Sequence, residues 1–140
     1  MPRDQKITAA AFFKVEIQDA VIGHFASCNG LGFSYELFEY KEGGLNMFTH
    51  QFRDRVAYPK LVLARGITDD LAMRRWFFAT KSPDARGHVI VSLLSRKSQE
   101  VQRWAYSRAF PVKWDGPTLD SSGSQVAMET LEIAHEGLLP

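Results

Sequence analysis

The chain has 140 residues, of which 45% are hydrophobic and 24% are charged. This length is sufficient for one hydrophobic core without covalent crosslinks, and the composition excludes a disordered chain. The 17 basic residues nearly balance the 16 acidic ones, so no overall charge draws the chain to nucleic acid or to anionic lipid. We therefore expect residues 1–140 to form a single domain.

Two further features bear on the cellular compartment. Cys28 is the only cysteine, so no internal disulfide can form, and a small buried residue is its expected role. No apolar run is long enough for a signal peptide or a membrane span. These features predict synthesis in the cytoplasm without a membrane anchor, and they leave release by lysis open.

Alternating apolar and polar residues predict several strands in the first half of the chain. Residues 13–17 have the two-residue period of a half-buried strand, and a tight turn at 18–19 favours a hairpin with residues 21–25. A third strand is predicted over residues 31–40, with aromatic residues on both faces, and a fourth over 61–65. Short connections between strands indicate antiparallel pairing.

Residues 41–58 interrupt this pattern. They contain a turn signal at Gly43 and Gly44, followed by a weak alternation of Phe48, His50 and Phe52. We interpret the segment as a long loop or a loose hairpin. Long loops in compact domains are usually functional or ordered by a partner, so this segment is the first indication of function.

One helix is predicted over residues 71–79, after a capping segment at 68–70. Its apolar residues fall on one stripe at helical spacing: Ala72, Met73, Trp76 and Phe77. This stripe indicates that the helix packs on a sheet. Residues 88–94, which are rich in Val, Ile and Leu, then predict another strand.

Residues 99–114 are predicted to form a long strand with two unlike faces. Trp104, Tyr106 and Phe110 share one face. The other face carries mainly small or polar residues: Val101, Arg103, Ala105, Ser107 and Ala109. Such a face is typical of a surface that meets water or closely approaching backbone.

The last predicted strand covers residues 125–135. Its alternation is imperfect, because Leu131 and Ile133 share a face with Glu129. About seven strands and one helix are predicted in total, with mostly short connections. The predicted fold is therefore mainly β, an antiparallel β-sandwich or barrel with one flanking helix.

The sequence contains no recognisable catalytic, cofactor-binding or metal-binding motif. Four histidines lie in separate segments, without zinc-site spacing: His24, His50, His88 and His135. The glycine clusters lack the residues of a phosphate-binding loop, and Cys28 has no nucleophile motif around it. Glu36 and Glu39 fall on opposite faces of their strand, so they cannot act together as acid and base from that strand. We expect a protein that is not an enzyme and that needs no cofactor.

Several segments nevertheless resemble, in order and spacing, those of one structural family. They are FKVEI at residues 13–17, CNGLG at 28–32, FEYKEGGLN at 38–46, YPKLVLARG at 58–66, AFPVKW at 109–114 and LEIAHEGL at 131–138. The family is that of the tail tube proteins of contractile phage tails, R-type pyocins and extracellular contractile injection systems, distantly akin to the ring protein of type VI secretion. No single motif is specific, but the ordered set spans almost the whole chain.

The resemblance implies a structural role as an inner-tube subunit. Six copies would form a ring, and stacked rings would form a hollow tube that conducts DNA or an effector protein after sheath contraction. The implied partners are further copies of the chain, a contractile sheath protein, baseplate or tube-initiator and spike proteins, a tube-terminating cap and the cargo in the lumen. The implied location is a phage tail or phage-tail-like particle, in the cytoplasm or released from the cell.

The resemblance also suggests two sets of contact residues. The segment that would reach a neighbouring subunit includes Gly43, Gly44, Leu45, Asn46, Met47, Phe48 and Tyr58. The small and polar strand face would line the lumen with Arg103, Ala105 and Ser107. Because Leu45, Met47 and Phe48 are more apolar than expected for the family, we predict that a neighbour buries them. A charge at Met47 or Phe48 should then abolish tubes and leave the monomer folded.

Two other readings remain open. A tube-initiator or baseplate paralogue of the same fold would have the same sequence features but would need partners to assemble. A small β-barrel that binds a ligand or acts as an enzyme would require a concave pocket lined by perturbed polar groups.

Overall fold

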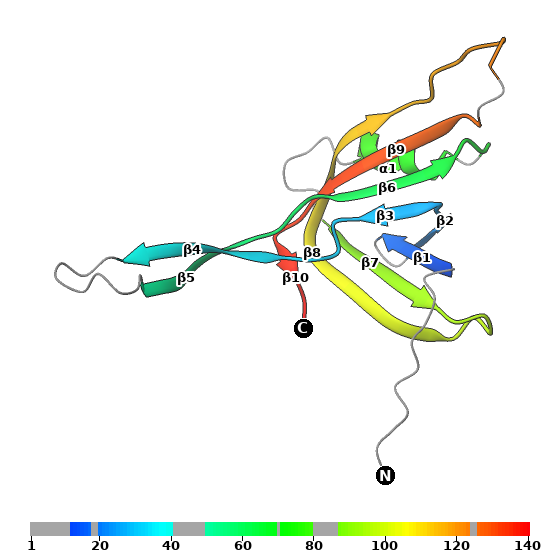
Figure 1. Cartoon of the computed structure of the whole chain (residues 1–140). Helices are drawn as coiled ribbons and strands as arrows, with labels where there is room; N and C mark the ends of the chain where they lie inside the picture. The colour runs from blue at the N-terminus through cyan, green and yellow to red at the C-terminus, as the bar shows by residue number, and fades with distance from the viewer. Residues whose placement is uncertain (1–11, 18–19, 41–49, 70, 80–86, 124–125) are drawn as a thin grey trace.

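The computed structural model describes residues 12–17, 20–40, 50–69, 71–79, 87–123 and 126–140. These residues form ten strands and one helix, shown in Figure 1. In chain order they are β1 (Phe12–Ile17), β2 (Ala20–His24), β3 (Ser27–Asn29), β4 (Ser34–Tyr40), β5 (His50–Ala57), β6 (Leu61–Gly66), α1 (Ala72–Ala79), β7 (Gly87–Leu94), β8 (Glu100–Asp115), β9 (Met128–Ala134) and β10 (Gly137–Leu138).

Eight of these strands are arranged in two layers that share one strand. The ladder runs in the order β2-β1-β7-β8-β9-β6-β3, with β10 on β8, and every pairing is antiparallel. β8 pairs with β7 through its first half and with β9 through its second half, so it belongs to both layers. The ladder ends at β2 and β3 without closing. The mainly antiparallel β-sandwich is thus confirmed, and a closed barrel is not formed.

β8 changes layer at a bulge near its middle. Arg108 has a positive φ of 50°, and two residues of β8 oppose one residue of β7 between the pairs Tyr106–Val89 and Ala109–Gly87. The extra residue reverses the alternation of side chains beyond it. Ala109, predicted on the polar face, is therefore fully buried, and that part of the prediction was wrong.

The core fills the space between the two layers. β1 and β7 supply Val15, Ile17, Val89 and Val91, β6 and β9 supply Leu61, Leu63, Leu131 and Ile133, and β8 supplies Tyr106. These positions follow the period of two that predicted the strands. Burial of each aliphatic side chain stabilises the fold by about 1.5–3 kcal/mol.

The helix closes one end of this core. α1 begins one residue later than predicted, and Figure 1 shows it behind β6 and β9. Met73 and Trp76 are buried, and Ala72 and Phe77 pack beside them. The predicted apolar stripe is therefore confirmed.

The imperfect alternation of the last strand has a structural cause. Glu129 of β9 is buried directly opposite Arg65 of β6, and Arg65 Nε donates to Glu129 Oε1 at 2.5 Å. The Trp114 indole donates to the other carboxylate oxygen at 3.2 Å, and the Arg65 guanidinium lies over the Phe25 ring. Glu129 can thus occupy a core position because Arg65 on the adjacent strand balances its charge.

The strand predicted over residues 31–40 begins only at Ser34, as β4. A separate short strand, β3, precedes it in the chain and pairs with β6. Gly30 lies between them with a φ of 93°, and a Cβ atom there would lie 2.1 Å from the Lys60 carbonyl oxygen. The chain can pass this close to Lys60 only with glycine at that position.

The segment interpreted as a long loop contains a strand. Residues 50–57 form β5, which pairs with β4 alone, so the hairpin alternative is confirmed for these residues. We call this two-stranded sheet the arm. Figure 1 shows it extending away from the two layers, and every residue of β4 is exposed.

Candidate assembly surfaces

One face of the arm is aromatic. Phe38 pairs across the strands with Phe52, and Tyr40 pairs with His50, so all four rings lie on the same side. His50 and Phe52 stack with ring centroids 6.4 Å apart. Phe38 is 56% exposed and Phe52 is 55% exposed. A lone subunit therefore leaves a patch of aromatic surface in water, which is a mark of an interaction site.

The opposite face of the arm also carries apolar groups. Tyr35 pairs with Val56, and Leu37 pairs with Arg53, whose guanidinium lies 4.9 Å from the centre of the Tyr35 ring. Leu37 is exposed. Neither face of the arm packs against a core, so burial of these side chains requires another molecule.

Aromatic contacts hold the base of the arm to the body. The Tyr58 ring lies 5.9 Å from the Phe33 ring and 5.5 Å from the His135 ring, measured between centroids. Tyr58, predicted as an inter-subunit contact, thus packs within its own subunit while part of it remains exposed. The other predicted contact residues, 43–48, lie outside the described residues.

The predicted lumen residues lie on one polar face of the sheet. Strand register places Arg103 of β8 beside Ser92 of β7, which lies beside Lys14 of β1. The next row consists of Ala105, Ile90 and Glu16. Ser107 follows on β8, where its carbonyl accepts from the Glu136 amide of the C-terminal segment. Strand alternation therefore places Arg103, Ala105 and Ser107 on one face, and their position in a lumen stays a prediction.

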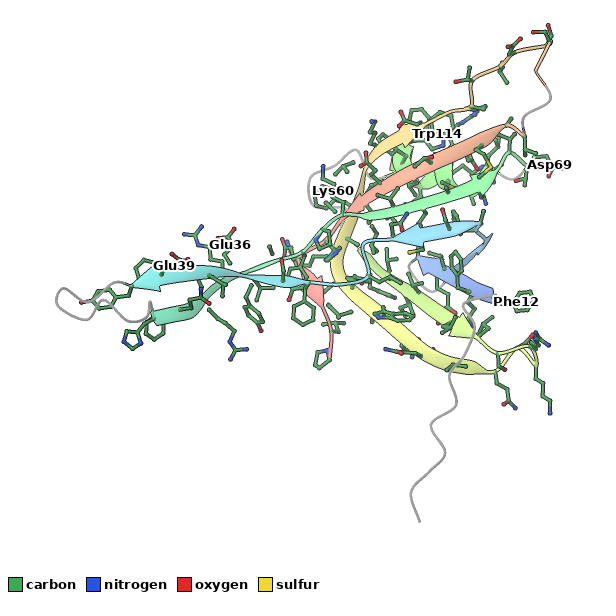
Figure 2. The ribbon with its side chains drawn as sticks, in the orientation of Figure 1. Phe12, Glu36, Glu39, Lys60, Asp69 and Trp114 are labelled. Carbon is green, nitrogen blue, oxygen red and sulfur yellow. The ribbon has the colours of Figure 1, made fainter. Side chains whose placement is uncertain are left out.

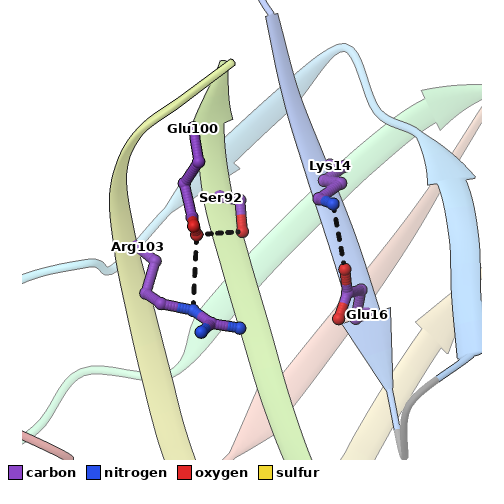
Figure 3. A network of polar contacts seen from close by, with 5 residues as sticks. All are labelled: Lys14, Glu16, Ser92, Glu100 and Arg103. Carbon is purple, nitrogen blue, oxygen red and sulfur yellow. Dashed lines mark hydrogen bonds and ion pairs between the residues drawn. The ribbon is translucent and has the colours of Figure 1, made fainter. Parts of the chain in front are cut away.

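Charges on this polar face are paired with each other, as Figure 3 shows. Lys14 and Glu16 form an ion pair at 3.1 Å, and Arg103 pairs with Glu100 at 3.3 Å. The Ser92 hydroxyl donates to the same Glu100 carboxylate at 3.2 Å. These four charges cancel, so this part of the face carries no net charge.

A second apolar surface lies beside the helix. Phe77 and Phe78 of α1 and Trp114 of β8 line a pocket of about 420 Å³ together with Arg74. The Arg74 guanidinium lies 5.0 Å from the centre of the Trp114 ring, and Phe78 is largely exposed. We call this pocket the α1 groove.

A smaller pocket of about 260 Å³ opens at the other end of the sandwich. Its lining includes Phe13, Leu31, Trp104 and Cys28. Burial raises the pKa of the Cys28 thiol to about 11, which makes the thiolate scarce at neutral pH. Cys28 is half-buried, close to its predicted role as a packed residue.

No feature of catalytic chemistry emerges in the part of the chain that the structure describes. Those residues contain no group of three His, Cys, Asp or Glu side chains that could hold a metal ion. The helix among them is also not long and apolar enough to cross a membrane.

Sequence reasoning missed the aromatic face of the arm. The signal was the placement of Phe38 and Tyr40 before the turn at residues 43–44, and of His50 and Phe52 after it. Mirrored aromatic positions around a turn indicate cross-strand pairs. The α1 groove was missed because Trp114 and Phe78 are distant in sequence.

Comparison with known proteins identifies the family. The family model described as T4-like virus tail tube protein gp19 matches residues 9–139. No curated protein matches the chain.

Solved structures share the fold. A chain of the sheath-tube complex of PVC, an extracellular contractile injection system, has a TM-score of 0.85 at 19% identity, covering 97% of this chain and 92% of that one. A chain of the anti-feeding prophage baseplate has a TM-score of 0.81 at 24% identity, covering 97% and 95%. Hcp1 from Flavobacterium johnsoniae is more distant, with a TM-score of 0.50 at 13% identity over 89% of each chain. Because the family model covers nearly the whole chain, this protein belongs to the T4-like virus tail tube protein family.

Proposed function

We propose that this chain is the inner-tube subunit of a contractile, phage-tail-like particle. Residues 1–140 act as one domain, six copies close into a ring, and stacked rings form a hollow tube that conducts cargo after the sheath contracts. The role is structural rather than catalytic. The observation that carries this proposal is the arm, whose Phe38 and Phe52 rings are more than half exposed in the single subunit.

The open sandwich supports ring formation. Its ladder ends at β2 and β3, and each edge strand has a row of backbone groups that another chain can pair with. If the β2 edge of one subunit pairs with the β3 edge of the next, each pair of subunits still has one free β2 edge and one free β3 edge. The same contact can then repeat with a fixed rotation until the ring closes. The polar face then lines the lumen, where Arg103, Ala105 and Ser107 meet water.

The partners follow from this assembly. The structural neighbours come from a sheath-tube complex, a baseplate and a tube-terminating cap, and we propose the corresponding partners for this chain. Baseplate and spike proteins would contact one end of the tube and a cap the other, within a particle assembled in a bacterial cell or released from it.

Negative-stain electron microscopy of the purified protein over a range of concentrations tests the proposal. We expect rings or stacked tubes with an open central channel. The Phe38→Ser/Phe52→Ser variant should remain folded by circular dichroism and should form no tubes, because the aromatic face of the arm is removed. Monomers at every concentration would overturn the assignment as main tube subunit and would favour an initiator that needs baseplate partners.

A further inference from the structure

The α1 groove combines apolar side chains with a positive charge. Phe77, Phe78 and Trp114 line it together with Arg74. α1 carries Arg74 and Arg75 and contains no acidic residue. Among the described residues, no carboxylate forms an ion pair with either arginine. The groove thus suits a ligand that is both aromatic and acidic.

The arm has the complementary chemistry. β4 has the sequence SYELFEY, which contains two carboxylates and no basic residue. Glu36 shares the side of β4 that carries Phe38 and Tyr40, because alternate residues of a strand point the same way. Neither Glu36 nor Glu39 forms an ion pair with a described residue. One side of the arm therefore carries aromatic rings next to a free carboxylate.

We propose that the arm of one subunit docks in the α1 groove of a second copy of this chain. The aromatic face of the arm covers Phe77, Phe78 and Trp114, and Glu36, on the same side of β4, meets Arg74. This proposal rests on the proposed tube function and names the surface that receives the arm.

The occupant is a second copy because the arm cannot reach the groove of its own subunit. Figure 2 shows Glu36 and Glu39 on the arm, which points away from the body, whereas Trp114 lies on the body itself. The donor and acceptor surfaces are different, so each contact leaves one free arm and one free groove. Such a contact repeats from copy to copy, as a tube requires.

Charge distinguishes the α1 groove from the smaller pocket at the other end of the sandwich. The lining of that pocket includes Phe13, Leu31 and Trp104 but no charged side chain. A docked arm would bury the Glu36 carboxylate without a partner there, which is costly. At the α1 groove Glu36 faces Arg74.

A charge swap tests this contact. Glu36→Arg and Arg74→Glu each place like charges against each other, so each variant should raise the protein concentration needed for tubes on the order of tenfold or more. The double variant Glu36→Arg/Arg74→Glu should restore assembly, since the pair is re-formed with reversed sign. Arg74→Gln is the control for the lost stacking on Trp114. It should raise the protein concentration needed for tubes less than Arg74→Glu does. Circular dichroism checks that each monomer is folded.

Crosslinking gives a second, independent readout. In a Cys28→Ser background, cysteines at Tyr40 of the aromatic face and Phe78 of the groove should react with a short bismaleimide to give a ladder of oligomers on a denaturing gel. The matched pair at Tyr40 and Phe12, which lies on β1, should give little crosslinking.

The outcomes separate the two proposals. A wild-type protein that forms no tubes would count against the proposed function, and the crosslink would still decide whether arm and groove meet. Wild-type tubes together with folded single variants that assemble normally, or with a double variant no better than the singles, would overturn docking in the α1 groove. Absence of the Tyr40–Phe78 crosslink in intact tubes would overturn it as well.

Discussion

The rings of Tyr106 and His135 pack against each other with centroids 4.3 Å apart and an angle of 48° between their planes. Tyr106 is fully buried in the core, and His135 also contacts Tyr58 at the base of the arm. Neither His135 ring nitrogen has a hydrogen-bond partner among the described residues, and both are buried. This stack joins the arm to the core through an uncharged imidazole.

The first prediction concerns pH. Burial lowers the pKa of His135 below its ordinary value of 6.5, and the Pro59 backbone opposes part of this shift. In the window between the lowered pKa and 6.5, the unfolded chain binds a proton that the folded chain does not. Stability is therefore fully present above pH 6.5 and falls as the pH decreases below it. Urea unfolding between pH 7 and 5 measures the loss.

His135→Phe is the control for this effect. The variant keeps an aromatic ring between Tyr58 and Tyr106 and removes the titrating group. We expect its stability to decline less than that of the wild type over the same pH range. If the free energy of unfolding falls equally with decreasing pH in the two proteins, groups other than His135 cause the pH dependence.

The second prediction concerns Gly30. Gly30→Ala would place a Cβ atom against the Lys60 carbonyl oxygen at a positive φ, so we expect a loss of roughly 2–4 kcal/mol in the free energy of unfolding. Gly32→Ala is the matched control, because a Cβ at Gly32 has no neighbour within 4 Å. It should change stability by less than about 0.5 kcal/mol. Similar effects of the two variants in chemical denaturation would contradict the proposed role of Gly30.

The third prediction concerns the buried ion pair. Arg65→Met leaves the Glu129 carboxylate buried without its cation, which should cost about 3–5 kcal/mol. In Arg65→Met/Glu129→Gln the charge is absent and the amide oxygen can still accept from the Trp114 indole. We expect the double variant to be more stable than the single one in urea unfolding. A double variant that is less stable would mean that packing of Arg65, rather than its charge, dominates.

The fourth prediction concerns the reactivity of Cys28. With a pKa raised to about 11, the thiolate at pH 8 is rarer by roughly a hundredfold than in an unfolded chain. Reaction with a thiol reagent such as DTNB should therefore be slow in the native protein and fast in denaturant. Cys28→Ser provides the blank. A native rate equal to the denatured rate would show that the thiol is not protected by burial.

Strands with one buried face were predictable, and in the arm β4 was predicted as a strand whereas β5 was not clearly predicted. β1, β6 and β9 each present one side to the core, so their hydrophobic period appears in the sequence. β5 buries neither side, so its alternation is weak and only the hairpin alternative anticipated it. β3 and β10, with three and two residues, are too short to produce a period.

Tertiary pairing explains the remaining differences. The bulge at Arg108 could not be foreseen, because it depends on how β8 pairs with β7, and it moved Ala109 to the buried side. Glu129 was noticed as an irregularity, but its partner Arg65 is 64 residues away. On the polar face, Arg103 and Ala105 keep the predicted alternation because they precede the bulge.

Because β8 belongs to both layers, the two layers cannot unfold independently. One continuous strand supplies backbone hydrogen bonds to both layers, and the bulge between its halves is held by an ion pair from Arg108 to Glu136. Separation of either layer would break this strand's pairing and open the shared core around Tyr106 to water. We therefore expect the two layers to melt in a single transition. A chain cut within β8 should yield no fragment that folds alone, so expressing the two halves separately would not rebuild the subunit's layers.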